Sequence, residues 1–140
     1  MLNIHLMDIY TFQRMQNMLN AIFAIKPKYV EKIFSGEKRF EFRSTVCKQQ
    51  INKIVIYETS PISKIVGEVS VSKVLKDTPE NIWLKTKDYA GIDYDSFMNY
   101  FKERKFAFAY VLENPTRYET PKFLSEYNIK SVPQSFVYLK

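Results

Sequence analysis

The sequence contains very little cysteine, histidine or glycine, and each scarcity excludes a kind of functional site. There is one cysteine, one histidine and three glycines in 140 residues. A single cysteine cannot form an internal disulfide, and Cys47 with His5 cannot build an ordinary zinc site. Three glycines are too few for a glycine-rich phosphate loop. We therefore expect no metal and no cofactor, and we interpret Cys47 as a structural side chain because no downstream histidine can activate it.

Long apolar segments are also missing. No run of about eighteen apolar residues occurs, so we expect no membrane-spanning helix and no membrane partner. The first residues lack a basic region followed by a clean apolar core, which argues against a secretory signal peptide. The expected location is the cytoplasm.

The composition indicates one folded domain with an uneven distribution of positive charge. Hydrophobic residues make up 46% and aromatic residues 16% of the chain, which excludes a disordered polypeptide. The net charge is +6, and residues 22–53 alone contain eight basic and three acidic residues. A local positive field attracts polyanions such as nucleic acids, although many basic proteins carry such charge only as a solubilising surface. Charge alone leaves both interpretations open.

Residues 1–20 differ from the rest and are interpreted as an amino-terminal extension of a domain that covers residues 21–140. Apolar side chains near residues 6–12 could share one face of a short helix, but no cap and no strong period support it. Two interpretations remain open. Translation starts naturally at Met18, or an amphipathic helix packs on the domain or on a partner.

From residue 22 the pattern becomes regular. Residues 22–26 form a short apolar strand, and Pro27 then begins a helix that Gly36 terminates. Residues 38–43 alternate in polarity, which predicts a strand with Phe40 and Phe42 in the core. The opposite face of that strand carries charged side chains and is expected to point outward to solvent: Arg39, Glu41 and Arg43.

The remaining elements indicate an α+β fold. Gly67 inside a long apolar strand predicts a bulge, and Asn114-Pro115 predicts a turn. Helices are expected to begin near Pro79 and Asp93, each after a capping residue. Further strands are predicted at residues 53–57, 64–75, 105–112, 117–122 and 134–139. This order favours a small mixed β-barrel with one proline-led helix before the strand at 38–43 and two inserted helices.

Two segments carry a resemblance to a known family. The strand, the proline-led helix and residues 36–43, which fit the pattern G-x-K-x-x-E-x-R, resemble the opening of ASCH domains in the PUA-like superfamily. Residues 57–61, 66–68 and 133–139 resemble further segments of one ASCH subgroup, in which the domain is sometimes fused to a helix-turn-helix and described as a predicted transcriptional regulator. No helix-turn-helix fits into the first twenty residues, so regulation through DNA does not follow from the resemblance.

The resemblance implies a cleft that binds RNA or modified nucleotides. Lys38 would stand at the mouth of the strand, and Glu41 with Arg43 would offer an acceptor and a donor to a base edge. Tyr57 and Tyr110 offer flat faces for stacking, although such tyrosines, like Trp83, are also common core residues. Glu41 and Arg43 can equally be a simple ion pair. The complete set of candidate binding residues is Lys26, Lys28, Lys38, Glu41, Arg43, Tyr57, Ser60, Gln134 and Ser135.

Three functions remain in competition. The first and preferred one is a binding module for RNA or a nucleotide, with DNA as a less favoured ligand. The second is an enzyme acting on RNA or a modified nucleoside, either an amidohydrolase or a ribonuclease, with Lys38 and Glu41 as candidate catalytic acid–base groups. One ASCH branch resembles an amidohydrolase of acetylcytidine that uses a lysine, a threonine and a glutamate, but Glu41 stands here at the threonine position. The third is an interaction protein that uses the apolar amino-terminal segment. The oligomeric state is left open.

Overall fold

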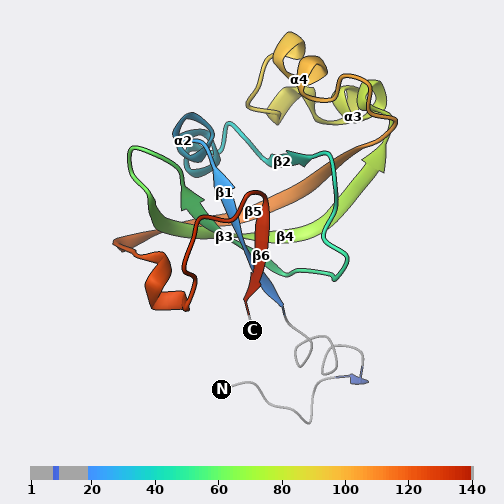
Figure 1. The fold of residues 1–140 in the computed structure, drawn as a ribbon. Helices are drawn as coiled ribbons and strands as arrows, with labels where there is room; N and C mark the ends of the chain where they lie inside the picture. Colours follow the sequence, from blue (N-terminus) through green and yellow to red (C-terminus); the bar gives the residue numbers. More distant parts are fainter. Residues whose placement is uncertain (1–7, 10–18, 140) are drawn as a thin grey trace.

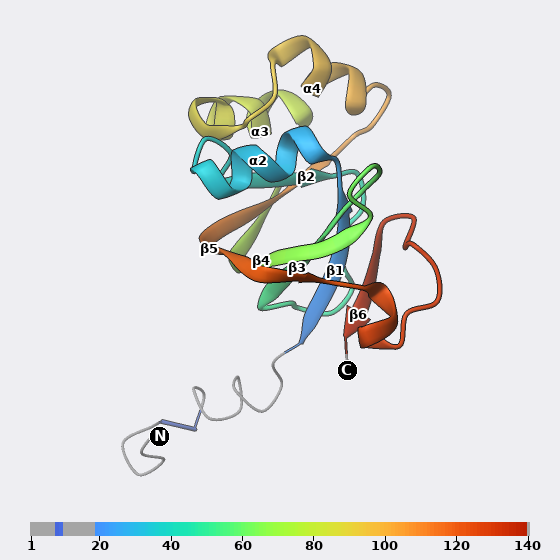
Figure 2. The ribbon, with the colours of Figure 1, turned by 90° about the vertical axis from the view of Figure 1, so that its left-hand side faces the viewer.

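A strongly curled six-stranded sheet forms the centre of the molecule (Figures 1 and 2). The computed structural model describes residues 8–9 and 19–139. The strand order is β2-β5-β4-β3-β1-β6, in which β1 and β3 are parallel and every other pair of neighbours is antiparallel. The strands are β1 (Asn20–Ile25), β2 (Phe40–Arg43), β3 (Lys53–Glu58), β4 (Lys64–Asp77), β5 (Ala107–Lys122) and β6 (Phe136–Leu139).

Three α-helices cover parts of this sheet, which confirms the predicted α+β class. They are α2 (Pro27–Ser35), α3 (Pro79–Thr86) and α4 (Tyr94–Tyr100), with short 3-10 turns at η2 (Lys87–Tyr89) and η3 (Leu124–Tyr127). Pro27 stands at the start of α2, and Gly36 ends it in the left-handed conformation, with φ of 86°. Thr78 caps α3 by accepting a hydrogen bond from the Asn81 N–H, and Asp93 caps α4 through the Ser96 N–H.

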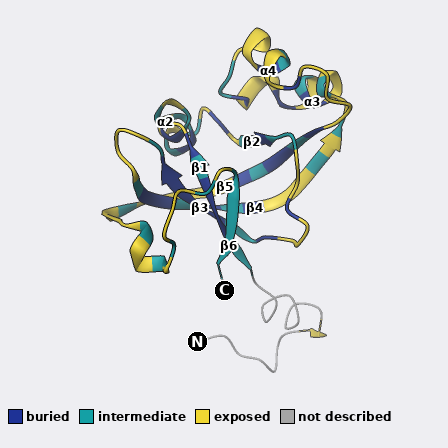
Figure 3. Ribbon diagram, in the orientation of Figure 1, coloured by how far each residue is buried: buried dark blue, intermediate teal, exposed yellow. Residues whose placement is uncertain are grey.

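The apolar side chains separate into three clusters, and these explain how the sheet curls. The largest lies inside the curl beneath α2 and contains Phe23, Ile33, Ile54 and Tyr110. A second cluster joins Phe42 of β2 to α3 and α4, so these two helices form a layer above β2 and β5 (Figures 1 and 3). The third lies on the other face of β1 and β3, around Ile22, Val55, Tyr57 and Ile65. Because β2 and β6 stand at opposite edges, the sheet is a half-barrel.

The predicted bulge at Gly67 is confirmed. The β3–β4 register shifts between Ile56 and Tyr57, and the β4–β5 register shifts between Ile65 and Gly67. A side chain at Gly67 would collide with the Thr116 carbonyl of β5 and with the Phe34 ring of α2. The glycine therefore allows the sheet to bend closely around α2.

The predicted turn at Asn114-Pro115 is wrong. The strands expected at residues 105–112 and 117–122 are one continuous strand, β5, that pairs with β4 over most of its length. Asn114 adopts a positive φ of 53°, and the β4–β5 register shifts between Glu68 and Ser70. Asparagine tolerates this left-handed conformation, so the chain bends within the ladder instead of leaving it.

Two further expectations concern the amino terminus and membranes. Most of residues 1–20, including the possible short helix near residues 6–12, lies outside the described residues, and β1 begins at Asn20. Among the residues that the structure describes, no helix combines the length and the apolar character needed to cross a bilayer.

Candidate functional site

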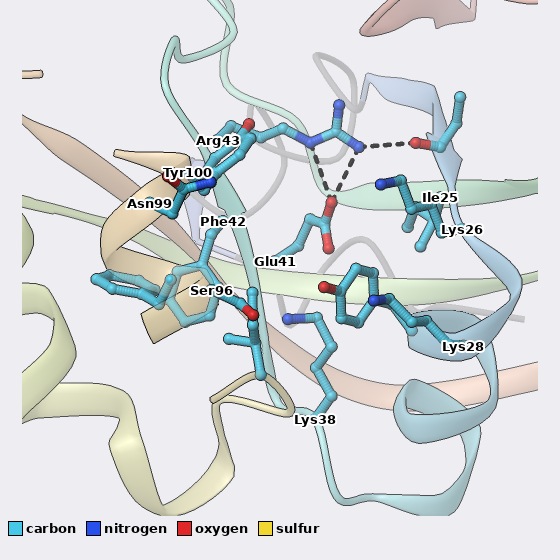
Figure 4. Close-up of a pocket in the computed structure, with 14 residues that line it drawn as sticks. Ile25, Lys26, Lys28, Lys38, Glu41, Phe42, Arg43, Ser96, Asn99 and Tyr100 are labelled. Carbon is cyan, nitrogen blue, oxygen red and sulfur yellow. Dashed lines mark hydrogen bonds and ion pairs between the residues drawn. The ribbon is translucent and has the colours of Figure 1, made fainter. Parts of the chain in front are cut away.

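A pocket of about 440 Å³ opens at the place where β1, α2, β2 and α4 meet (Figure 4). Its floor and walls are partly apolar, with Phe42 and Ile92 among the lining residues. Its polar side chains come from separate parts of the chain: Lys26, Lys28, Lys38, Glu41, Arg43, Ser96 and Asn99. The pocket therefore combines flat apolar surface with hydrogen-bonding groups of both kinds, as small-molecule sites do.

Arg43 connects the two edges of the half-barrel. Its Nε donates to Glu41 Oε2 at 3.0 Å, and its Nη2 lies 2.9 Å from the same oxygen. Nη2 also donates to the Ala24 carbonyl of β1 at 3.0 Å, and Nη1 donates to the Ser135 carbonyl at 3.3 Å, directly before β6. We call this set of contacts the Arg43 bridge. A planar guanidinium suits it because it offers several N–H donors in fixed directions.

The expectation that Glu41 and Arg43 point outward is wrong. Glu41 is only 7% exposed, and the Arg43 side chain is largely covered. Strand β2 has both faces covered, because Phe42 packs against α3 and α4 while Arg43 lies over the Phe23 ring at 4.8 Å. The alternation of polar and apolar residues in β2 therefore does not mark a solvent-exposed face. It distinguishes two covered faces, one that carries Phe42 and one that carries the ion pair of Glu41 and Arg43.

Lys38 lies two residues before β2 and is buried, with 3% exposure. Its Nζ donates to the Ala90 carbonyl at 2.8 Å and lies 4.6 Å from the centre of the Phe42 ring. Gly91 makes room for it, because a side chain there would collide with the first carbons of Lys38. Figure 4 shows the Lys38 and Glu41 head groups directed toward the same hollow.

Burial changes the acid–base behaviour of Lys38. Loss of hydration lowers its pKa from 10.5 to about 8, and the nearby positive charges of Lys32 and Arg43 contribute in the same direction. Attraction to the Glu41 carboxylate opposes this effect. At neutral pH the ammonium form predominates and donates hydrogen bonds, while a minor population of neutral amine can accept a proton.

The structure brings five of the predicted binding residues together at this pocket: Lys26, Lys28, Lys38, Glu41 and Arg43. Lys26 and Lys28 are exposed at its mouth. Ser135 adjoins the site through its contacts with Arg43, whose Nη1 also reaches its hydroxyl at 3.4 Å.

The other candidates lie elsewhere. Tyr57 belongs to the third apolar cluster, and Ser60 is exposed in the turn after β3. Gln134 is exposed and is not part of the pocket lining. Tyr110 is a core residue whose hydroxyl accepts a hydrogen bond from the Cys47 N–H at 2.9 Å, and Trp83 packs in the second cluster.

Sequence reasoning missed the contribution of α4 and of Tyr29. Ser96, Asn99 and Tyr100 of α4 line the pocket, and Tyr100 is 50% exposed. The apolar stripe of α4 was visible in the sequence, which implies a polar opposite face. Nothing local indicates that this face turns toward β2, because its position depends on packing between Phe42 and Phe97, whose ring centres are 4.9 Å apart.

The side chains that line the pocket define the contacts it can make. Within residues 8–9 and 19–139 no group of three or more His, Cys, Asp or Glu side chains lies together in a way that could hold a metal ion. The groups that can contact a ligand are ammonium, carboxylate, amide, hydroxyl and aromatic groups.

The fold is the PUA-like fold of ASCH domains. A crystal structure of ASCH from Zymomonas mobilis superposes with a TM-score of 0.79 at 22% identity, over 86% of this chain and 87% of that one. The chain belongs to the family described as Domain of unknown function (DUF365), whose model matches residues 18–132.

Two curated relatives are longer than the region they share with this chain. The "Large ribosomal subunit protein uL22" of Ureaplasma parvum is 32% identical over 115 residues, which are 81% of this chain and 37% of that protein. The "ASCH domain-containing ribonuclease" of Zymomonas mobilis is 24% identical over 95 residues, which are 67% of this chain and 64% of that protein. The chain thus spans about a third of the first relative and less than two thirds of the second.

Replacement of Arg43 by lysine should destabilise the protein strongly. A lysine keeps the charge but cannot reach Glu41, Ala24 and Ser135 together, so buried acceptors lose their donor. We expect the free energy of unfolding to fall by about 3 kcal/mol, measured by urea denaturation. Arg117→Lys is the control, since Arg117 pairs with Glu31 at the surface and should change stability by less than about 1 kcal/mol. Equal small losses in both variants would contradict the structural role of the Arg43 bridge.

Replacement of Lys38 by methionine should change how stability depends on pH. The Lys38 pKa is about 8 in the folded protein and near 10.5 when the chain is unfolded, so the unfolded state binds more protons between these values. The unfolding free energy of the wild type therefore rises with pH across this window, by roughly 3 kcal/mol from this residue, whereas Lys38→Met lacks that contribution. Urea denaturation at several pH values between 7 and 10.5 measures the difference.

The matched control is Lys130→Met, which removes an exposed lysine. Its stability curve should run parallel to that of the wild type. If the Lys38→Met curve does the same, Lys38 is not held in a desolvated environment.

Proposed function

We propose that this protein binds single-stranded RNA and that the pocket receives one nucleotide of the strand. The observation that carries the proposal is the convergence of the buried Lys38 ammonium and the buried Glu41 carboxylate on one pocket of about 440 Å³. A nucleobase edge presents N–H donors beside carbonyl acceptors, so Glu41 can accept from it while Lys38 donates to it. Both groups are largely desolvated, which strengthens such contacts.

The rim of the pocket suits the remaining parts of a nucleotide. Lys26 is the residue before α2 and Lys28 lies in its first turn, so both ammonium groups add to the positive end of the helix dipole. A phosphate at this position would be attracted by both effects. Tyr100 and Tyr29 line the same pocket and offer aromatic faces for a base.

The comparisons support a function related to RNA. One relative carries the description of a ribonuclease, and it shares the ASCH domain with the solved structure that has the same fold. The identity to that relative is 24%, so residue roles are not transferred from it. Support for the pocket comes from the chemistry of its own side chains.

Binding should depend on the rim tyrosine. We expect Tyr100→Ala to weaken binding of a short single-stranded RNA by about tenfold, because loss of base stacking costs roughly 1–3 kcal/mol. Fluorescence anisotropy with a labelled RNA of about three nucleotides measures the effect, and Tyr94→Ala is the matched control. Tyr94 is an exposed tyrosine of the same helix that does not line the pocket.

Two outcomes would contradict this proposal. One is equal affinity of wild type and Tyr100→Ala. The other is an affinity that stays constant between low and moderate salt, since phosphate contacts release counterions and must weaken as salt rises. The same titration with DNA of matching sequence tests whether the 2′-hydroxyl contributes.

A second candidate function is cleavage of the bound RNA, favoured by the pKa of Lys38 of about 8. The neutral amine of Lys38 would take the proton of a 2′-hydroxyl, and the 2′-oxygen would attack the adjacent phosphorus. The bond from phosphorus to the 5′-oxygen would break, and that oxygen would receive a proton from the ammonium or from water. The products would be a 2′,3′-cyclic phosphate and a 5′-hydroxyl. Glu41 would stabilise the ammonium that forms.

Cleavage by this route should become faster as pH rises. The reactive form is the neutral amine, so the rate should rise up to about pH 8 and level off above it. Gel analysis of a labelled RNA between pH 6 and 9 tests this, with Lys38→Met expected to be inactive and Tyr94→Ala fully active. A rate that is independent of Lys38 would exclude this residue as the base.

A further inference from the structure

A row of side chains leads from the pocket across three neighbouring strands. Arg43 of β2 is paired with Phe108 of β5, and Phe108 is in turn paired with Lys76 of β4. Directly opposite residues of antiparallel strands point to the same face, with Cβ atoms about 4.5–5.5 Å apart. The three side chains therefore follow one another on the same face, beginning at the edge of the pocket.

The far end of this row is a cluster of cations around an exposed aromatic ring. The Lys76 Nζ lies 4.5 Å from the centre of the Phe106 ring and 6.0 Å from that of Phe108. The Lys105 Nζ lies 5.4 Å from the centre of the same Phe106 ring, which is 37% exposed. We call these four residues, Lys76, Lys105, Phe106 and Phe108, the basic wing.

The positive charge of the basic wing is not neutralised by neighbouring carboxylates. Within the described part of the chain, no carboxylate lies at ion-pair distance from Lys76 or Lys105. The adjacent Asp77 is already occupied, because it accepts hydrogen bonds from the Thr78 N–H, from Asn81 and from Lys85. Two ammonium groups over one ring repel each other, so an anion placed between them would be attracted to both.

A short segment connects the pocket to the basic wing along the chain as well. Tyr100 lines the pocket at the end of α4, and Phe106 stands just before β5. Lys102 and Arg104, both exposed, lie between them. Figure 1 shows this segment passing from α4 to the start of β5, beside the end of β4. The exposed Glu103 stands between these two basic residues, and the segment 102–105 still carries three basic side chains against this one carboxylate.

We propose that a single strand of RNA with one nucleotide in the pocket continues along the exposed residues 102–105 and past Phe108 onto the basic wing. This inference rests on the proposed function and assigns a path for the strand beyond the pocket. Lys76 and Lys105 contact successive phosphates, and the exposed face of Phe106 stacks on a base. The combination favours RNA over an acidic protein, because cations that alternate with an exposed aromatic ring bind phosphates and bases together.

The experiment compares RNA of two lengths and two variants of equal charge. Lys76→Gln/Lys105→Gln removes the two cations of the basic wing. The control, Lys122→Gln/Lys130→Gln, removes two exposed lysines that lie away from the basic wing. Lys122 is the last residue of β5, where it pairs with Ile65, and Lys130 follows eight residues later. Affinity is measured for RNA of about three nucleotides, which fills the pocket alone, and of about ten, within the site sizes common for single strands. Each titration is repeated at several salt concentrations.

We expect the longer RNA to bind the wild type more tightly than the shorter one. The wing variant should bind the longer RNA about tenfold more weakly, and its slope of log affinity against log salt should be smaller by about 1.4, corresponding to two lost phosphate contacts. Its affinity for the shorter RNA should be unchanged. Phe106→Ala should also weaken binding of the longer RNA by about fivefold or more and leave binding of the shorter RNA unchanged. The control variant should follow the wild type.

Each other result overturns the inference in a recognisable way. Equal losses in the wing variant and the control would show a general charge effect and leave the pocket proposal intact. Equal affinities of the wild type for the two RNA lengths would show that no strand extends beyond the pocket, and would also leave the pocket proposal intact. If the wing variant keeps its RNA affinity but loses binding of polyglutamate, the surface binds an acidic protein. If the wild type binds neither RNA, the proposed function and the inference both fail.

Discussion

The Arg43 bridge is the contact on which both the architecture and the pocket depend. A half-barrel has two free edges, and here the guanidinium of an edge strand donates to Glu41, to β1 and to the residue before β6. These contacts fix the distance between β2 and the start of α2, which is the width of the pocket. The element G-x-K-x-x-E-x-R therefore specifies structure first, and the proposed binding chemistry depends on where the structure places Lys38.

Burial of the Lys38 ammonium costs folding free energy, which other contacts in the fold must offset. The residue loses its hydration and retains one hydrogen bond, to the Ala90 carbonyl. An apolar side chain of similar length would fill the same space at a lower desolvation cost, so packing alone does not explain a lysine here. Gly91 lies directly against the Lys38 stem. A desolvated ammonium at a pocket is a strong hydrogen-bond donor, because no water shell competes for it.

The sequence predicted what local chemistry determines and missed what depends on distant packing. Pro27, Gly36 and Gly67 identified a helix start, a helix end and a bulge, because each constrains the backbone at its own position. Asn114 was misread as a turn, since a positive φ fits a bend inside a ladder equally well. The burial of Glu41 and the approach of Tyr100 could not be predicted, because α4 and β2 are far apart in sequence and meet only through the second apolar cluster.

The charge balance within the pocket narrows the kind of ligand that fits it. Arg43 and Glu41 neutralise each other through contacts to a single carboxylate oxygen, Oε2. The charge that remains comes from Lys38 on the inside and from Lys26 and Lys28 at the mouth, so the pocket as a whole is positive. An uncharged nucleobase would satisfy Lys38 and Glu41 but would leave the two outer lysines without a counterion. A nucleotide, the proposed ligand, would supply the base to the interior and its phosphate to the rim, so a unit of a nucleic acid strand would match this charge distribution better than a free base.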